Sequence, residues 1–146
     1  MRRSLGSILV LMFLAGCSGK KVPESPDAVD NRQITPEDGV EKILNLNQGW
    51  KHADANWFYE TPQGSQLIPL DWFLNLEQPG SEELFRSDAN MRKFGYLRRK
   101  KSRTNPQALP VGFVKDPGVD RDWLGLTCAA CHTAQINYRG VGWLID

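Results

Sequence analysis

The pentapeptide 128–132, Cys-Ala-Ala-Cys-His, constrains this chain more than any other feature of its sequence. Cys128 and Cys131 stand three positions apart, which places their thiols on one face of a helical turn. The two alanines between them favour the helical conformation and leave that face uncrowded. His132 follows directly and adds an imidazole. We therefore expect a helical turn at 128–132 that presents these three side chains to a single ligand.

This C-x-x-C-H spacing is the attachment pattern of c-type haem. It predicts one covalent haem c, with thioether bonds from Cys128 and Cys131 to two vinyl groups and with His132 as an axial ligand of the iron. A disulfide between the two cysteines remains an alternative. A structural zinc site requires four ligands, and the other histidine, His52, is distant in the sequence. A thioredoxin-like motif would not require the histidine, and the sequence shows no strand–helix context for it.

The second axial ligand of such an iron is left open by the sequence. Only 14 residues follow His132, and none of them is methionine or histidine. Upstream, Met91 and His52 are candidates, although Met91 could equally pack in a helix and His52 could lie on the surface. The iron could also keep an open position or take a ligand from sequence outside this chain. A six-coordinate iron suits electron transfer, whereas an open position can bind peroxide or dioxygen.

Two further features bear on the expected haem site. The segment 92–103 carries seven basic residues and is either a solvated surface or a source of partners for the haem propionates. Arg98 and Arg99 are the candidates for propionate binding. Trp123, four residues before Thr127, is expected to pack near the porphyrin.

The N-terminus is typical of an export signal. Arg2 and Arg3 precede an apolar run at 5–14, and small residues then lead to Cys17. A membrane-spanning helix is the alternative for this run, but it would need about 20 apolar residues. The run at 5–14 has only ten residues. The end of this segment resembles a bacterial lipoprotein signal, which implies that Cys17 becomes an acylated N-terminus. The alternative is an ordinary signal peptide that leaves Cys17 as a free thiol.

These features predict an exported protein held by lipid at a bacterial membrane and facing the periplasm. Ser18 favours the outer over the inner membrane. The polar, proline-containing segment 17–34 is expected to be a flexible tether. Removal of residues 1–16 would leave 16 Lys and Arg beside 17 Asp and Glu, a balance that gives no case for nucleic acid as a partner. The expected partners are membrane lipid and a redox protein.

The hydrophobic pattern predicts a mainly α, cytochrome c-like haem domain, incomplete, with long loops and a short C-terminal β-hairpin. Its expected domains are a lipoprotein signal peptide at 1–16, the tether at 17–34 and the N-terminal part of a c-type cytochrome domain at 35–146. Capping residues and apolar spacing predict helices at 36–46, 53–59, 70–76, 81–87 and 122–134. The segment 104–118 is expected to be an extended loop, and 136–145 a hairpin that turns at Arg139-Gly140.

The sequence Leu-Thr-Cys-Ala-Ala-Cys-His-Thr at 126–133 resembles the large di-haem cytochromes of the cytochrome c peroxidase and rubber-oxygenase group. Gln-Gly-Ser-Gln-Leu-Ile-Pro at 63–69, Asp-Trp-Phe-Leu-Asn-Leu-Glu-Gln at 71–78 and Leu-Pro-Val-Gly-Phe at 109–113 support the resemblance, which covers 50–146. The haem motif alone is unspecific among cytochromes, and its combination with these segments is more specific.

The resemblance implies a mostly helical protein with two haem domains that acts outside the cytoplasm on peroxide, or on polyisoprene with dioxygen. This chain departs from that pattern because it has a single haem motif and ends within the expected hairpin. We therefore expect the N-terminal part of such a protein. The expected function is electron transfer by a haem-binding module. The alternatives are the first haem domain of a truncated di-haem peroxidase or oxygenase, and a remnant without activity.

Overall fold

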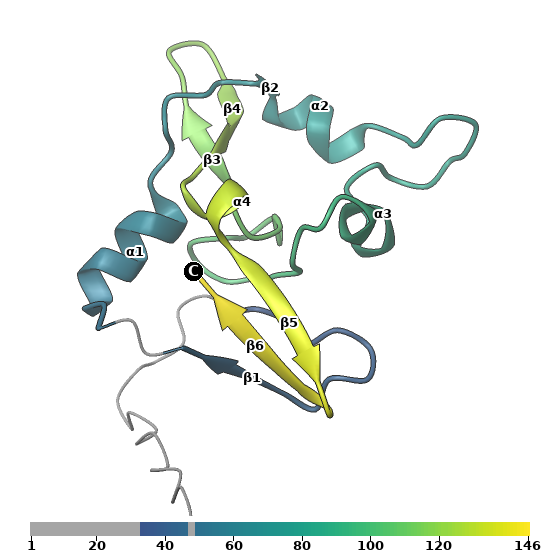
Figure 1. The fold of residues 1–146 in the computed structure, drawn as a ribbon. Coiled ribbons are helices and arrows are strands. Elements are labelled where there is room, and N and C mark those ends of the chain that lie inside the picture. Colours follow the sequence, from purple (N-terminus) through teal and green to yellow (C-terminus); the bar gives the residue numbers. More distant parts are fainter. Residues whose placement is uncertain (1–32, 47–48) are drawn as a thin grey trace, which may run out of the picture.

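The computed structural model describes residues 33–46 and 49–146 and shows a mixed arrangement of short helices and two small sheets (Figure 1). One three-stranded sheet has the order β2-β4-β3 and is antiparallel throughout. It is formed by β2 (Ile68–Pro69), β3 (Phe113–Pro117) and β4 (Asp122–Leu126). Phe113 pairs with Leu126 at one end of the β3–β4 hairpin, and Pro117 pairs with Asp122 at the other.

The second three-stranded sheet has the order β1-β6-β5 and contains both kinds of pairing. It is formed by β1 (Lys42–Asn45), β5 (Ala134–Tyr138) and β6 (Val141–Ile145). β5 and β6 form an antiparallel hairpin, whereas β1 lies parallel to β6 although it comes from the other end of the described chain. This parallel pairing joins the two ends of the described chain in one sheet.

Within residues 33–46 and 49–146, four short helices accompany the sheets. They are α1 (His52–Glu60), α2 (Leu70–Asn75), α3 (Asp88–Lys93) and α4 (Ala129–His132). α4 lies between β4 and β5 in sequence and therefore connects the two sheets, as Figure 1 shows. The described residues include no helix with the length and hydropathy needed to cross a membrane.

Each sheet has its own group of buried side chains. Around the sheet β1-β6-β5, α1 and α4, the buried residues are Ile34, Tyr59, Leu97, Val111, Ala129 and Leu144. Around the sheet β2-β4-β3, α2 and α3, they are Leu70, Phe73, Met91, Leu109, Phe113 and Leu124. We call these the first and the second core. Because burial of apolar surface is the main force that holds such elements together, the two sheets are stabilised largely by separate sets of contacts.

The expected mainly α fold is wrong, and two segments account for most of the difference. The segment expected as a helix at 36–46 turns at 38–39 and then forms β1, because Gly39 has φ +81° and the strand finds a parallel partner in β6. The segment expected to be helical at 122–134 begins as β4, whose backbone bonds to β2 and β3. Only Ala129–His132 is helical there.

Two smaller expectations also need correction. No helix forms at 81–87, because Ser81 Oγ accepts a hydrogen bond from the Glu83 amide and Glu77 bridges Leu84 in a tight turn. The helix begins later, where Ser87 caps α3 by accepting from the Asn90 amide. The loop expected at 104–118 ends at Val111–Gly112, and Phe113–Pro117 forms β3.

Other expectations are confirmed. The helices expected at 53–59 and 70–76 are α1 and α2. The C-terminal hairpin turns at Arg139-Gly140, where both residues have positive φ angles of 48° and 75°. Such a pair of left-handed residues is what a tight two-residue hairpin requires.

The first described residues are bound to the rest of the fold. Ile34 is buried, and it forms a bridge with Arg99. Thr35 N–H donates to the Arg98 carbonyl at 2.9 Å. The folded chain thus includes Ile34, whereas the expected signal peptide at 1–16, Cys17 and most of the expected tether lie outside the described residues.

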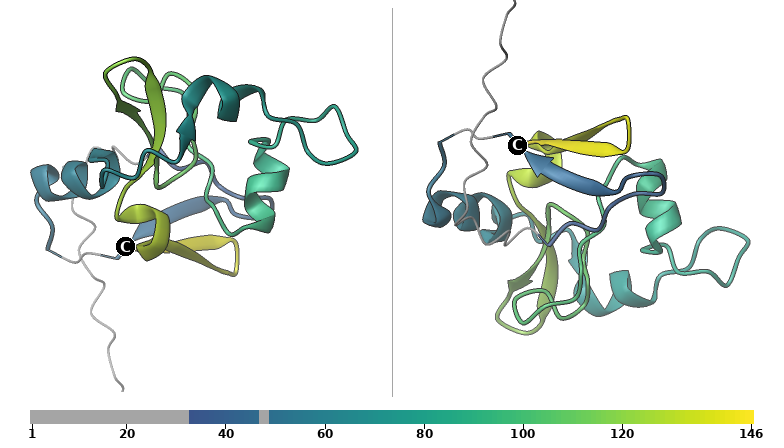
Figure 2. Two further views of the ribbon diagram at one scale, coloured as in Figure 1. Left: turned by 90° about the horizontal axis from the view of Figure 1, so that it is seen from above. Right: turned by 90° about the horizontal axis from the view of Figure 1, so that it is seen from below.

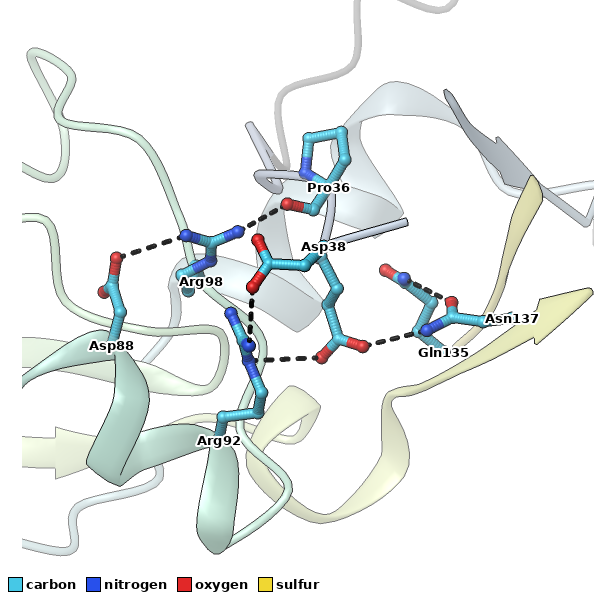
Figure 3. A network of polar contacts seen from close by, with 8 residues as sticks. Pro36, Asp38, Asp88, Arg92, Arg98, Gln135 and Asn137 are labelled. Carbon is cyan, nitrogen blue, oxygen red and sulfur yellow. Dashed lines mark hydrogen bonds and ion pairs between the residues drawn. The ribbon is translucent and has the colours of Figure 1, made fainter. Parts of the chain in front are cut away.

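A network of charged side chains strengthens this attachment (Figure 3). On α3, the Arg92 Nη1 atom lies 3.4 Å from Asp38 Oδ2, and its Nε atom lies 4.0 Å from Glu37 Oε1. Asn137 on β5 donates to the same Glu37 carboxylate at 2.9 Å. Glu37 and Asp38 therefore connect α3 to β5, the edge strand of the sheet β1-β6-β5.

Candidate functional site

The C-x-x-C-H residues form the turn that connects the two sheets. β4 ends at Leu126, Thr127 N–H donates to the Gly112 carbonyl at 2.9 Å, and α4 then begins at Ala129. His132 N–H donates to the Cys128 carbonyl at 3.2 Å, which closes one helical turn. β5 starts two residues later, at Ala134. The helical turn expected at 128–132 is confirmed, but it is held between strands rather than inside a longer helix.

The packing of the turn directs its two alanines inward. Ala129 is buried in the first core. Ala130 lies against the backbone of Gly112, where a Cβ atom would come within 2.2 Å of the Ala130 Cα atom. Gly112 also has φ +85°, so this position favours glycine for two independent reasons. Gly112 was not predicted to be part of the site, although it lies in the segment Leu-Pro-Val-Gly-Phe at 109–113.

The reactive side chains of the turn lie toward the surface. Cys131 and His132 are exposed, and Cys128 is half-buried. Both cysteines are free thiols. The His132 imidazole makes no hydrogen bond or ion pair within the described part of the chain. Across the described residues, no three His, Cys, Asp or Glu side chains converge on a point that could hold a metal ion. Two thiols and an imidazole on one exposed turn are the donors that a covalently attached haem would use.

The candidate second axial ligands lie elsewhere. Met91, on α3, is 3 % exposed and packs in the second core, whereas Ala129 of the cysteine turn belongs to the first core. The Met91 thioether is therefore packed in the second core in this structure. His52 is the first residue of α1, and its side chain is outside the described part of the structure.

The arginines expected to bind propionates have partners within the protein. Arg98 donates to the Pro36 carbonyl at 2.5 Å and lies 3.7 Å from Asp88 (Figure 3). Arg99 forms a short ion pair with Glu60, and its side chain is only 1 % exposed. The basic segment is therefore not a uniformly solvated surface, because at least these two arginines join parts of the fold.

Trp123 is also placed differently from the expectation. It lies on β4 opposite Asp116 and Pro69, and its indole ring packs beside Gly118 at the β3–β4 turn. That turn is the end of β4 away from Cys128. Trp123 thus supports the β3–β4 hairpin.

Two hollows in the described structure do not involve α4. One, of about 130 Å³, lies beside the Glu60–Arg99 pair, and the other, of about 230 Å³, is lined by Trp50, Asp54, Trp57 and Phe58. Pockets for cofactors and drug-sized ligands usually enclose about 300–1,000 Å³. The cysteine turn instead stands at an open surface.

Comparison with known proteins finds a relative from Sinorhizobium fredii (strain NBRC 101917 / NGR234), described as uncharacterized protein y4iJ. It is 30% identical over 129 residues, which cover 73% of this chain and 21% of the relative. The chain thus spans about a fifth of the length of that protein. No protein-family model matches the chain. No solved structure matches it.

Proposed function

We propose that this protein is a c-type cytochrome module that binds one haem covalently and transfers electrons in the periplasm. The observation that carries the proposal is the α4 turn, where Cys128, Cys131 and His132 follow one another on a surface turn fixed from behind by Ala129 and Gly112. Two free thiols and an imidazole in this spacing are the groups that haem attachment uses.

Each residue of the turn has a separate task in this proposal. The thiols of Cys128 and Cys131 would hold the haem by thioether bonds, each adding across a vinyl group so that the sulfur bonds to one carbon and the thiol hydrogen goes to the other. His132 offers an imidazole nitrogen to the iron. When bound, the haem supplies the one-electron redox couple. Ala129 packs in the first core and Ala130 against Gly112, so these contacts support the turn that carries the thiols and the imidazole.

The same proposal includes the location of the protein. The segment around Cys17 resembles a lipoprotein signal, and haem is attached to c-type cytochromes outside the cytoplasmic membrane. Lipid on Cys17 would hold the module at a membrane facing the periplasm, with Ser18 favouring the outer membrane. There it would exchange electrons with a redox partner protein.

The experiment that tests haem binding is expression in a host that matures c-type cytochromes. The wild-type protein should keep its haem through denaturation and acid–acetone extraction, and the Cys128→Ala/Cys131→Ala variant should lose it. A matched control is Cys17→Ser, which should keep the haem because this residue is not in the motif. Haem that extracts freely from the wild-type protein would contradict the proposal.

The alternative function is that of the first haem domain of a di-haem peroxidase or oxygenase. It is favoured by the resemblance at 63–69, 71–78, 109–113 and 126–133, and by the burial of Met91 away from the cysteine turn. An iron with an open position should bind carbon monoxide or cyanide rapidly, with a shift of its absorption bands. A haem that shows no such shift would leave electron transfer as the better proposal.

A further inference from the structure

The sheet β1-β6-β5 has an apolar outer face. Residues paired across a sheet point to the same side, and successive residues along a strand point to opposite sides. Leu144 is fully buried in the first core, so its neighbours Trp143 and Ile145 lie on the outer face. Val141 lies on the same face as Trp143 because it is two residues away on β6. The residues paired with these three on the neighbouring strands also lie on this face, namely Lys42, Leu44, Ala134, Ile136 and Tyr138. We call these eight residues the outer face.

The outer face is exposed although most of it is apolar. Ile136 is 56 % exposed, Trp143 37 % and Ile145 39 %. Both views in Figure 2 show this sheet at one side of the molecule, with the other described elements behind its inner face. Large contiguous apolar patches on a protein surface usually mark a binding site. The outer face is therefore expected to receive a ligand or a partner.

The outer face changes in character along the strands. The row Ala134–Ile145 and the row Leu44–Trp143–Ile136 lie nearest to α4 and are wholly apolar. At the far end, the row of Lys42, Val141 and Tyr138 adds an ammonium and a phenol. Arg139, in the hairpin turn, holds its guanidinium 5.1 Å from the centre of the Tyr138 ring. The face thus runs from an apolar end beside the cysteine turn to an end with two cations, next to which the Glu41 side chain lies against Gly140.

The change from apolar to charged residues along the face matches the change from vinyl to propionate groups along a haem attached at Cys128 and Cys131. The vinyl edge of a porphyrin would lie at the cysteines, and its two propionate carboxylates project from the opposite edge. Ala134 to Tyr138 spans four residue steps, which is about 13 Å in a β-strand. We propose that the haem lies along the outer face, with its apolar part over Ile136, Trp143 and Ile145 and its propionates beside Arg139 and Lys42. This inference rests on the proposed covalent haem attachment.

Haem fits the outer face better than the other possible occupants. A second copy of the chain or another protein segment would bury the apolar rows, but neither accounts for two cations at the end remote from the cysteines. Arginine pairs with carboxylates through bidentate hydrogen bonds. Arg139 and Lys42 have no ion pair within the described residues, whereas Arg98 and Arg99 are bonded to Asp88 and Glu60. Lys42 on the outer face and Arg139 in the adjoining hairpin turn are therefore available to pair with carboxylates.

Hydroxyl-radical footprinting tests this inference on the haem-loaded protein and on Cys128→Ala/Cys131→Ala, read out by mass spectrometry of single residues. The haem should reduce oxidation of Trp143 and Tyr138 several-fold relative to the double variant. Trp72 on α2, which is 63 % exposed and remote from the outer face, should be oxidised equally in both proteins.

The possible outcomes are distinct. Covalent haem with protected Trp143 supports the inference. Covalent haem with equal oxidation of Trp143 in both proteins overturns the inference and leaves the proposed function standing. A wild-type protein that carries no covalent haem overturns both. Protection that persists in the double variant also overturns the inference, because it would show that a second copy or another segment covers the face.

A second measurement tests the cationic end. Arg139→Gln should lower the midpoint potential of the haem, because a nearby positive charge disfavours the more positive oxidised iron. Arg121→Gln, an exposed arginine at the β3–β4 turn, removes the same charge away from the outer face and should leave the potential unchanged. Equal potentials in wild type and Arg139→Gln would overturn the placement of the propionates.

Discussion

Gly112 packs directly on Ala130, so closely that a Cβ atom at Gly112 would lie 2.2 Å from the Ala130 Cα atom and 2.4 Å from its nitrogen. The contact joins the loop before β3 to the cysteine turn, and Thr127 N–H adds a 2.9 Å hydrogen bond to the Gly112 carbonyl. The backbone at Gly112 thus fixes the position of α4 from behind.

Gly112→Ala should destabilise the fold and reduce haem attachment. The added methyl group would push α4 away from Gly112, and such overpacking lowers the free energy of unfolding by about 1–3 kcal/mol. An alanine at positive φ lowers it by a further amount of about 1–2 kcal/mol. Gly64→Ala is the matched control, since Gly64 has φ +72° but open space around it. Urea unfolding followed by circular dichroism should show the larger loss for Gly112→Ala. Equal losses would contradict the packing role.

Arg99→Ala should be strongly destabilising. Its side chain is 1 % exposed, and its guanidinium pairs with Glu60 at the end of α1. Removal of one partner from a buried ion pair leaves the other charge uncompensated and typically costs about 3–5 kcal/mol. Because Glu60 is 29 % exposed and can be partly solvated, we expect the lower end of that range.

The control for Arg99 is the exposed pair of Lys115 and Asp122, which lie 3.1 Å apart with 47 % of each side chain exposed. Lys115→Ala should change the free energy of unfolding by less than about 1 kcal/mol, as solvent screens such pairs. The same urea titration measures both variants. A small effect of Arg99→Ala would show that the buried pair is not a structural tie.

Met91→Leu should leave the absorption spectrum of the haem-loaded protein unchanged. The Met91 side chain is packed in the second core, and a leucine of similar volume usually costs less than about 1.5 kcal/mol. A spectral shift in this variant, with His132 intact, would instead identify Met91 as the second axial ligand.

Cys17→Ser should move the protein from the membrane fraction to the soluble fraction of cells that process lipoproteins. Acyl chains on this cysteine would supply the membrane affinity. Serine has no thiol to carry them, so the variant would not be anchored. Cell fractionation and immunoblotting measure the distribution. Cys131→Ala provides the comparison, because it should impair haem attachment without changing the membrane fraction.

The elements that sequence alone determined are those that depend on neighbours along the chain. The hairpin at Arg139-Gly140 follows from alternation and from two residues that accept positive φ. The helix expected at 81–87 was wrong, because the Ser81 hydroxyl accepts from the Glu83 amide in a tight turn and Ser87 caps the helix that follows. The Cys128–His132 spacing required only one helical turn, and that turn is present.

What only the tertiary structure decided depends on partners remote in sequence. The apolar spacing at 40–44 is compatible with a helix, but β1 forms because β6 supplies a parallel partner about a hundred residues later. Similarly, Asp122–Leu126 becomes a strand because β2 and β3 bond to both of its edges. The support of the cysteine turn by Gly112 and the outer face beside it likewise exist only once those pairings bring the segments together, since local patterning carries no information about which distant backbone will complete a sheet.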